Sequence, residues 1–137
     1  MNTKEIGNIG ENLACKFLIN NGFEIICRNY QKICGELDIV AFKKGTLHFF
    51  EVKTVSRETF NLRYIDNYRP EDNVNIKKIN KIEKTAKLFL LEKGFKDELI
   101  QIDLLTVFIK KESLITREVG LLNENCLIKY IPNINLV

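Results

Sequence analysis

Apolar residues return every three or four positions near the start of the chain. This spacing predicts a helix over residues 2–21 with one buried side. Asn2 can accept a hydrogen bond at the helix start, and Gly22 lies where the last turn would end. Gly7 and Gly10 lie on or beside the apolar stripe, where the lack of a side chain would let the backbone approach its neighbour. The pattern therefore predicts a helix packed closely against a sheet.

A second helical stripe lies in the middle of the chain and predicts a helix over residues 74–93 that ends at Gly94. Its apolar positions are Ile76, Ile79, Ile82, Ala86, Phe89 and Leu90. Another face of this helix carries lysines, among them Lys77, Lys78 and Lys81. A lysine face is ordinarily solvated, and the alternative is that these three residues contact a phosphate backbone.

Runs rich in Ile, Val, Leu and Phe predict the strands of a sheet. These runs span residues 23–30, 36–42, 46–53, 99–109, 114–119 and 126–132, of which the last two are weaker. The run 99–109 is apolar almost throughout, which is typical of a buried strand. The runs 36–42 and 46–53 flank the link Lys43-Lys44-Gly45, and such a Gly-containing link predicts a β-hairpin.

The end of this hairpin away from the turn is rich in charge. Side chains two apart share a face of a strand, so Glu36 and Asp38 lie together, as do Glu51 and Lys53. Three carboxylates repel one another unless cations compensate. Lys53 supplies one positive charge, and a divalent ion such as Mg or Mn would supply the rest. The alternative is a hairpin whose charged end is only solvated.

The segment 54–73 between the hairpin and the second helix lacks clear periodicity. It interleaves basic and aromatic residues, namely Arg57, Phe60, Arg63, Tyr64, Tyr68 and Arg69. Such residues suit phosphate contact and base stacking, which favours a mobile flap beside the acids. The alternative is a surface loop whose aromatic residues pack locally.

Composition describes one ordinary domain over residues 1–137, with 45% hydrophobic and 28% charged residues. A net charge of +3 permits an acidic partner such as nucleic acid without requiring one. No apolar run approaches the length of a membrane span, and no signal peptide is evident. The four cysteines have irregular spacing, which favours reduced thiols in the cytoplasm. His48, the only histidine, lies on the hairpin face opposite Glu51 and Lys53, where we expect a packed or surface residue.

The order of Asp38 and then Glu51-Val52-Lys53 resembles the D…ExK motif of the PD-(D/E)xK nucleases. Further stretches extend the likeness over nearly the whole chain. They are Gly7-x-x-Gly10-Glu11, Arg28 to Tyr30, Gly35 to Asp38, Phe50 to Thr54, Val74…Lys78…Ile82 and Gln101 to Asp103. Together they resemble the YraN-like family, UPF0102, a group of small, mostly bacterial proteins placed in that nuclease superfamily. The chain departs from the family at Cys34, where a glycine is usual, and at Val55, where a basic residue is frequent.

This resemblance implies an α/β fold with a restriction endonuclease-like core, in which helices flank a central mixed sheet. It also implies a Mg- or Mn-dependent endonuclease that hydrolyses phosphodiester bonds of DNA, with branched or single-stranded DNA as candidate substrates. Homodimers are common among relatives that cut branched DNA. The alternatives are a nucleic-acid-binding module without catalysis, acting as an accessory partner in DNA processing, and a protein-interaction domain.

The resemblance also assigns roles by position. Asp38, Glu51 and the backbone carbonyl of Val52 would hold the metal ion. Lys53 would orient or activate the attacking water, and Glu11 would close the site from the helix. Glu36 would be a further acid beside them. The basic residues expected to contact DNA are Arg57, Arg63, Arg69, Lys77, Lys78 and Lys81.

Overall fold

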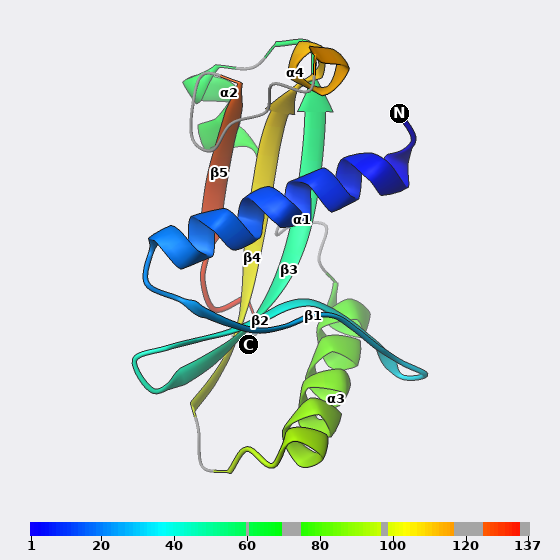
Figure 1. Ribbon diagram of the computed structural model, residues 1–137, viewed down its shortest axis with the longest axis vertical. Coiled ribbons are helices and arrows are strands. Elements are labelled where there is room, and N and C mark those ends of the chain that lie inside the picture. The colour runs from blue at the N-terminus through cyan, green and yellow to red at the C-terminus, as the bar shows by residue number, and fades with distance from the viewer. Residues whose placement is uncertain (60, 70–74, 97–98, 117–124, 135–137) are drawn as a thin grey trace.

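A five-stranded sheet forms the centre of the computed structural model, which describes residues 1–59, 61–69, 75–96, 99–116 and 125–134 (Figure 1). In spatial order the strands are β1 (Glu24–Lys32), β2 (Gly35–Lys43), β3 (Thr46–Arg57), β4 (Leu99–Lys110) and β5 (Cys126–Ile131). The pair β3–β4 is parallel, and the other three neighbouring pairs are antiparallel. The sheet is therefore mixed and flanked by helices, as expected of a restriction endonuclease-like core.

Two long helices cover the two faces of the sheet (Figure 1). Helix α1 (Thr3–Asn20) packs with Phe50 of β3 on one face, and α3 (Ile76–Lys93) packs with Phe49 on the other. Adjacent residues of β3 therefore belong to different cores, because side chains alternate across a strand. Strand β4 is buried on both faces from Ile102 to Ile109, which explains its nearly continuous apolar sequence.

Capping side chains and a glycine mark where the long helices begin and end. The side chain of Asn2 accepts the N–H of Glu5 at 2.8 Å, which confirms Asn2 as the N-cap of α1. Asn75 caps α3 in the same way by accepting the N–H of Lys78. Helix α3 ends at Gly94 in the left-handed conformation with φ 73°. Both long helices thus begin and end close to the predicted positions.

The predicted hairpin is confirmed as β2 and β3. Its turn places Lys44 at φ 48° and Gly45 at φ 82°, and two successive positive φ angles match the tight turns that hairpins favour. The pairing runs from Lys43 opposite Thr46 to Ile39 opposite Phe50. Beyond that point β2 continues to pair with β1 only, so the two hairpin strands separate immediately before the acidic residues.

The two glycines of α1, Gly7 and Gly10, differ in how closely other residues approach them. A Cβ atom on Gly10 would overlap Oγ1 of Thr54, so α1 touches β3 where glycine alone fits. A Cβ atom on Gly7 would meet nothing within 4 Å. The predicted close approach is therefore confirmed at Gly10 and wrong at Gly7, because α1 leaves a hollow beside Gly7.

The predicted flap over residues 54–73 is wrong in its described part. Parallel pairing with β4 extends β3 to Arg57, and residues 62–67 form the short helix α2 (Leu62–Asn67). The rings of Tyr64 and Tyr68 pack edge-on against Phe108 at centroid distances of 6.0 and 5.5 Å. These aromatic residues therefore pack locally, as the alternative proposed. Phe60 and residues 70–74 lie outside the described residues.

Residues 114–116 were predicted as a strand and instead end the short helix α4 (Lys111–Thr116). This helix begins directly after β4, and its Leu114 packs into the core on the α1 side of the sheet. Residues 117–119 lie outside the described residues. The four cysteines are free thiols, and no helix in the described residues is long and apolar enough to cross a membrane.

Candidate functional site

The candidate site lies where β2 separates from β3. Oδ2 of Asp38 accepts the N–H of Val52 at 2.8 Å, across the point where the pairing of the two strands has ended. The aspartate side chain thus satisfies a donor that a strand partner would otherwise satisfy. Glu51, one residue before Val52, is placed beside this link.

Four carboxylates from three segments influence one another here: Glu11 of α1, Glu36 and Asp38 of β2, and Glu51 of β3. Burial first, and then the charges of Glu51, Glu11 and Glu36, together raise the pKa of Asp38 to about 7 against the opposing hydrogen bond from Val52. The hairpin pattern predicted that the last three would gather, and the family resemblance added Glu11. The structure brings all four within electrostatic reach.

Glu11 has a buried carboxylate oxygen without a hydrogen-bond partner among the described residues. Burial raises its pKa, the charge of Arg28 opposes this shift, and Glu36 and Glu51 reinforce it. The oxygen without a partner is Oε1. An unpartnered buried acceptor is costly, and a cation would satisfy it.

Lys78 was predicted to contact a phosphate backbone, and its half-exposed side chain reaches one of the four acids. Its Nζ is 2.6 Å from Oε1 of Glu51, whose side chain is only 17% exposed. Burial lowers the pKa of Lys78, but the hydrogen bond and charge of Glu51, with Asp38 and Glu36, outweigh burial and raise it. Lys78 therefore remains charged and serves as the counter-ion that was predicted for Lys53.

Lys53 is exposed at the margin of the site and forms no ion pair with a described acid. It lines a cavity of about 320 Å³ between α1 and β3, together with Gly7, Glu11 and Val52. Lys53 and the helix acid thus share one accessible space. An amine in this position faces solvent, where a substrate can reach it.

Arg28 was not singled out as a site residue, although it lies in one of the stretches that resemble the family. Its Nη2 donates to Oδ1 of Asn12 at 2.9 Å, and its charge acts on Glu11. Arg28 and Lys78 are cations whose charges act on the four acids. With all six groups ionised, four negative and two positive charges leave two negative charges, before the exposed Lys53 beside them is counted.

The side chains do not stand in a closed metal cage. Within the described residues, no group of three or more acidic, histidine or cysteine side chains is placed to hold a metal ion. Glu51 is engaged by Lys78, and Asp38 is engaged by the N–H of Val52. The oxygen donors, their mutual repulsion and the unpartnered oxygen of Glu11 nevertheless suit a hard cation. A metal ion that took Oε1 of Glu51 as a ligand would displace the Lys78 amine from that oxygen.

The other residues predicted to contact DNA fall into two groups, one at and around α2 and the other on α3, and these two helices lie apart (Figure 1). Arg57, Arg63 and Arg69 are exposed at and around α2, and the Arg57 guanidinium lies 4.5 Å from the centroid of the Tyr64 ring. Lys77 and Lys81 are exposed on α3, next to Lys78. The α3 lysines are therefore adjacent to the acids, whereas the arginines are not.

The chain matches known sequences over most of its length. The model of "Uncharacterised protein family UPF0102" matches residues 10–107. A UPF0102 protein of Caldicellulosiruptor bescii is 37% identical over 118 residues, which cover 85% of this chain and 93% of that protein. A UPF0102 protein of Desulforamulus reducens is 40% identical, covering 80% of this chain and 85% of that protein. One of Dictyoglomus turgidum is 36% identical, with coverages of 80% and 86%. The matched family region contains all four carboxylates together with Lys53 and Lys78, and the chain belongs to the UPF0102 family.

Proposed function

We propose that this protein is a metal-dependent endonuclease that hydrolyses phosphodiester bonds of DNA. The observation that carries the proposal is the convergence of four carboxylates, in which burial and the neighbouring charges together raise the pKa of Asp38 to about 7. Such crowding is costly in a protein without a compensating cation. Functional sites are where perturbed carboxylates of this kind concentrate, and the D…ExK order supports nuclease chemistry in particular.

Asp38, Glu51 and the Val52 carbonyl would hold Mg or Mn. When bound, the metal ion would polarise the scissile phosphate and lower the pKa of a coordinated water. Lys53 would orient that water, since it shares the accessible cavity with Glu11. Glu11 would complete the acidic set through its unpartnered Oε1, and Glu36 would add negative charge from the exposed end of β2.

Lys78 has two positions in this scheme. Without metal its amine neutralises Glu51 at 2.6 Å. With metal on Glu51, the released amine would lie beside the scissile phosphate and stabilise negative charge that develops there. Lys77 and Lys81 would then contact neighbouring phosphates of a branched or single-stranded DNA, bound by a monomer or a homodimer.

The test uses branched, single-stranded and duplex DNA with Mg, Mn or EDTA. We expect cleavage that EDTA abolishes. Lys53→Ala should slow cleavage by about 100-fold, the scale for loss of one transition-state contact. Lys87→Ala is the matched control, because Lys87 is an exposed lysine of α3 away from the acids, and it should cut at the wild-type rate. A Lys53→Ala protein as active as wild type would refute the role of Lys53.

A second function is favoured by the Lys78–Glu51 pair, which already neutralises one of the acids. A DNA-binding module without catalysis would keep this pair closed. It predicts salt-sensitive DNA binding, no cleavage with any divalent ion, and no metal binding by calorimetry.

A further inference from the structure

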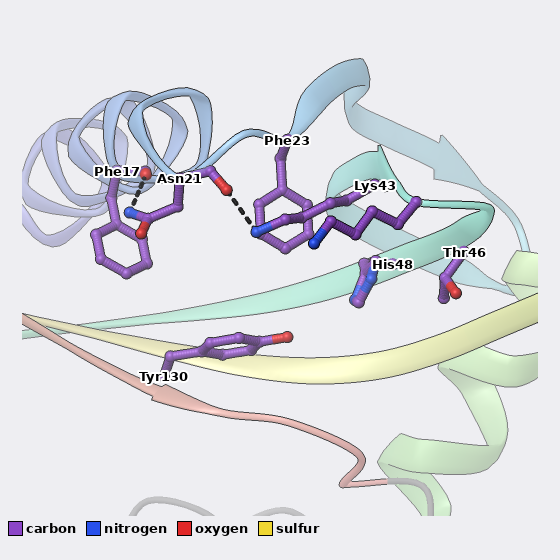
Figure 2. Close-up of a pocket in the computed structure, with 8 residues that line it drawn as sticks. Phe17, Asn21, Phe23, Lys43, Thr46, His48 and Tyr130 are labelled. Atoms are coloured by element: carbon purple, nitrogen blue, oxygen red, sulfur yellow. Dashed lines mark hydrogen bonds between the residues drawn. The ribbon is translucent and has the colours of Figure 1, made fainter.

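A cavity of about 360 Å³ lies between the C-terminal end of α1 and the β2–β3 turn (Figure 2). The residues that line it are all different from those that line the cavity at Glu11. It therefore forms a second region of the surface, independent of the carboxylates and of their metal. No part of the proposed nuclease chemistry uses it.

Aromatic rings from three separate segments form its walls. Phe17 comes from α1, Phe23 from the link that follows α1, and Tyr130 from β5. Figure 2 shows the three rings around the same space, with His48 on the sheet beside them. Phe23 is buried, whereas Phe17 and Tyr130 are half-buried and keep part of their rings accessible. Walls of this kind suit a flat ring.

His48 is held in one orientation by a buried carboxylate. Its Nδ1 lies 2.6 Å from Oδ2 of Asp103, which is fully buried. Asp103 also accepts from Tyr130 Oη at 2.7 Å, Gln101 Nε2 at 2.8 Å and the N–H of Asn133 at 2.9 Å. A carboxylate only accepts, so Nδ1 of His48 carries the proton and Nε2 is the ring nitrogen left for a ligand. Of the two alternatives that the sequence left open for His48, a packed or a surface residue, the structure shows the packed one.

The rim of the cavity is positively charged. Lys43 and Lys44 both line it, and none of the described residues that line it is acidic. Nζ of Lys43 donates to the carbonyl of Asn21 at 2.6 Å and lies 4.9 Å from the centroid of the Phe23 ring (Figure 2). Lys44 sits in the turn at φ 48° and forms no hydrogen bond or ion pair with another described residue. One lysine is thus fixed over an aromatic wall, and the other is available.

We propose that this cavity binds a nucleotide. The base would lie between the aromatic walls, the phosphate would meet Lys44 and Lys43, and Nε2 of His48 would form a hydrogen bond to the ligand. A volume of about 360 Å³ falls in the range of ligand pockets. A free phosphate would leave the rings unused, and an uncharged nucleoside would leave the lysines unused. Both a free mononucleotide and the 5′-terminal nucleotide of a DNA strand have the required chemistry.

The first experiment titrates thymidine 5′-monophosphate into the full chain in EDTA, so that a metal at the carboxylates plays no part. Amide NMR shifts locate the site, and calorimetry measures its affinity. We expect saturable shifts at Phe23, Thr46 and His48, and binding at least about 5-fold weaker for thymidine and for inorganic phosphate. The proposal is overturned if no saturable shift appears up to about 10 mM, or if the shifts gather around Glu11 and Glu51.

Two variants test the walls and the rim separately. Lys44→Asn removes the charge, and asparagine tolerates the positive φ of the turn, so binding should weaken about 5-fold. Phe17→Ala removes one wall and should weaken binding about 10-fold. Lys87→Asn removes an equal charge from α3, on the other face of the sheet, and should bind as wild type does. Unchanged affinity in both pocket variants, with native amide spectra, overturns the proposal.

The two sources of the ligand are distinguished with short thymidine oligonucleotides. A 5′-phosphorylated tetranucleotide that binds about 10-fold tighter than the mononucleotide, through the same amides, identifies a DNA end. A mononucleotide that binds as tightly as the tetranucleotide identifies a free nucleotide. Both results support a nucleotide site. Cleavage activity is not measured in any of these titrations, so failure of the nuclease proposal would leave them unaffected.

Discussion

Asp38 and Asp103 are both largely buried, but hydrogen-bond donors surround Asp103, whereas other carboxylates surround Asp38. Asp103 accepts from four donors supplied by β3, β4, β5 and the segment after β5. Among the described residues, Asp38 accepts from one donor, the N–H of Val52, and burial and the charges of three carboxylates raise its pKa. Burial alone therefore does not distinguish a structural acid from a functional one. The number of donors that meet the carboxylate does, because negative charge that no donor meets is balanced by a held proton or by a cation.

The largest expected effect is on stability. Asp103→Asn replaces a fully satisfied carboxylate and leaves its donors mismatched, so the free energy of unfolding should fall by about 3–5 kcal/mol. Asp38→Asn relieves repulsion and keeps an oxygen for Val52, so the change near neutral pH should stay within about 1 kcal/mol. Urea unfolding measures both. Equal losses in the two variants would erase the distinction between these aspartates.

The second effect concerns pH. The pKa of Asp38 is raised from 3.8 to about 7 in the folded protein, so the native state holds a proton that the unfolded chain has already released. Stability from this group is therefore complete below about pH 4 and is lost as the pH rises through about 7. Wild type should lose about 2–3 kcal/mol more than Asp38→Asn between pH 5 and 7.5 in urea unfolding. Parallel pH profiles of the two proteins would contradict the assignment.

The smallest effect is on metal affinity. Because the amine of Lys78 occupies Glu51, Lys78→Met should bind Mn about 10-fold more tightly than wild type in calorimetry, although cleavage should slow. Lys77→Met is the control, since Lys77 is an exposed neighbour on the same helix. If Lys78→Met binds Mn no better than Lys77→Met, the amine and the metal do not compete.

Local patterns were sufficient for much of the fold. The caps at Asn2 and Gly94 and the turn around Gly45 depend on residues within a few positions of one another, so the sequence places them closely. Helix α2 was missed because it spans only six residues, too short for a periodic stripe, and its stability comes from Phe108 in a distant strand.

The candidate site was predictable as a set of acids and not as a set of contacts. Alternation along β2 and β3 gathers Glu36, Asp38 and Glu51, because their places follow from one hairpin. The partner of Glu51 could not be inferred, since helical periodicity places Lys78 on a face without saying what that face meets. The donors of Asp103 come from segments that only the folded sheet brings together.

The contact between Gly10 and Thr54 fixes how this protein can change over evolutionary time. No space separates the helix that carries Glu11 from the strand that carries Glu51, since a single methyl group at position 10 would overlap the threonine hydroxyl. A larger residue at one of these two positions would require a smaller one at the other. Substitutions there are expected to occur as compensating pairs, and unpaired ones would displace one carboxylate relative to the other.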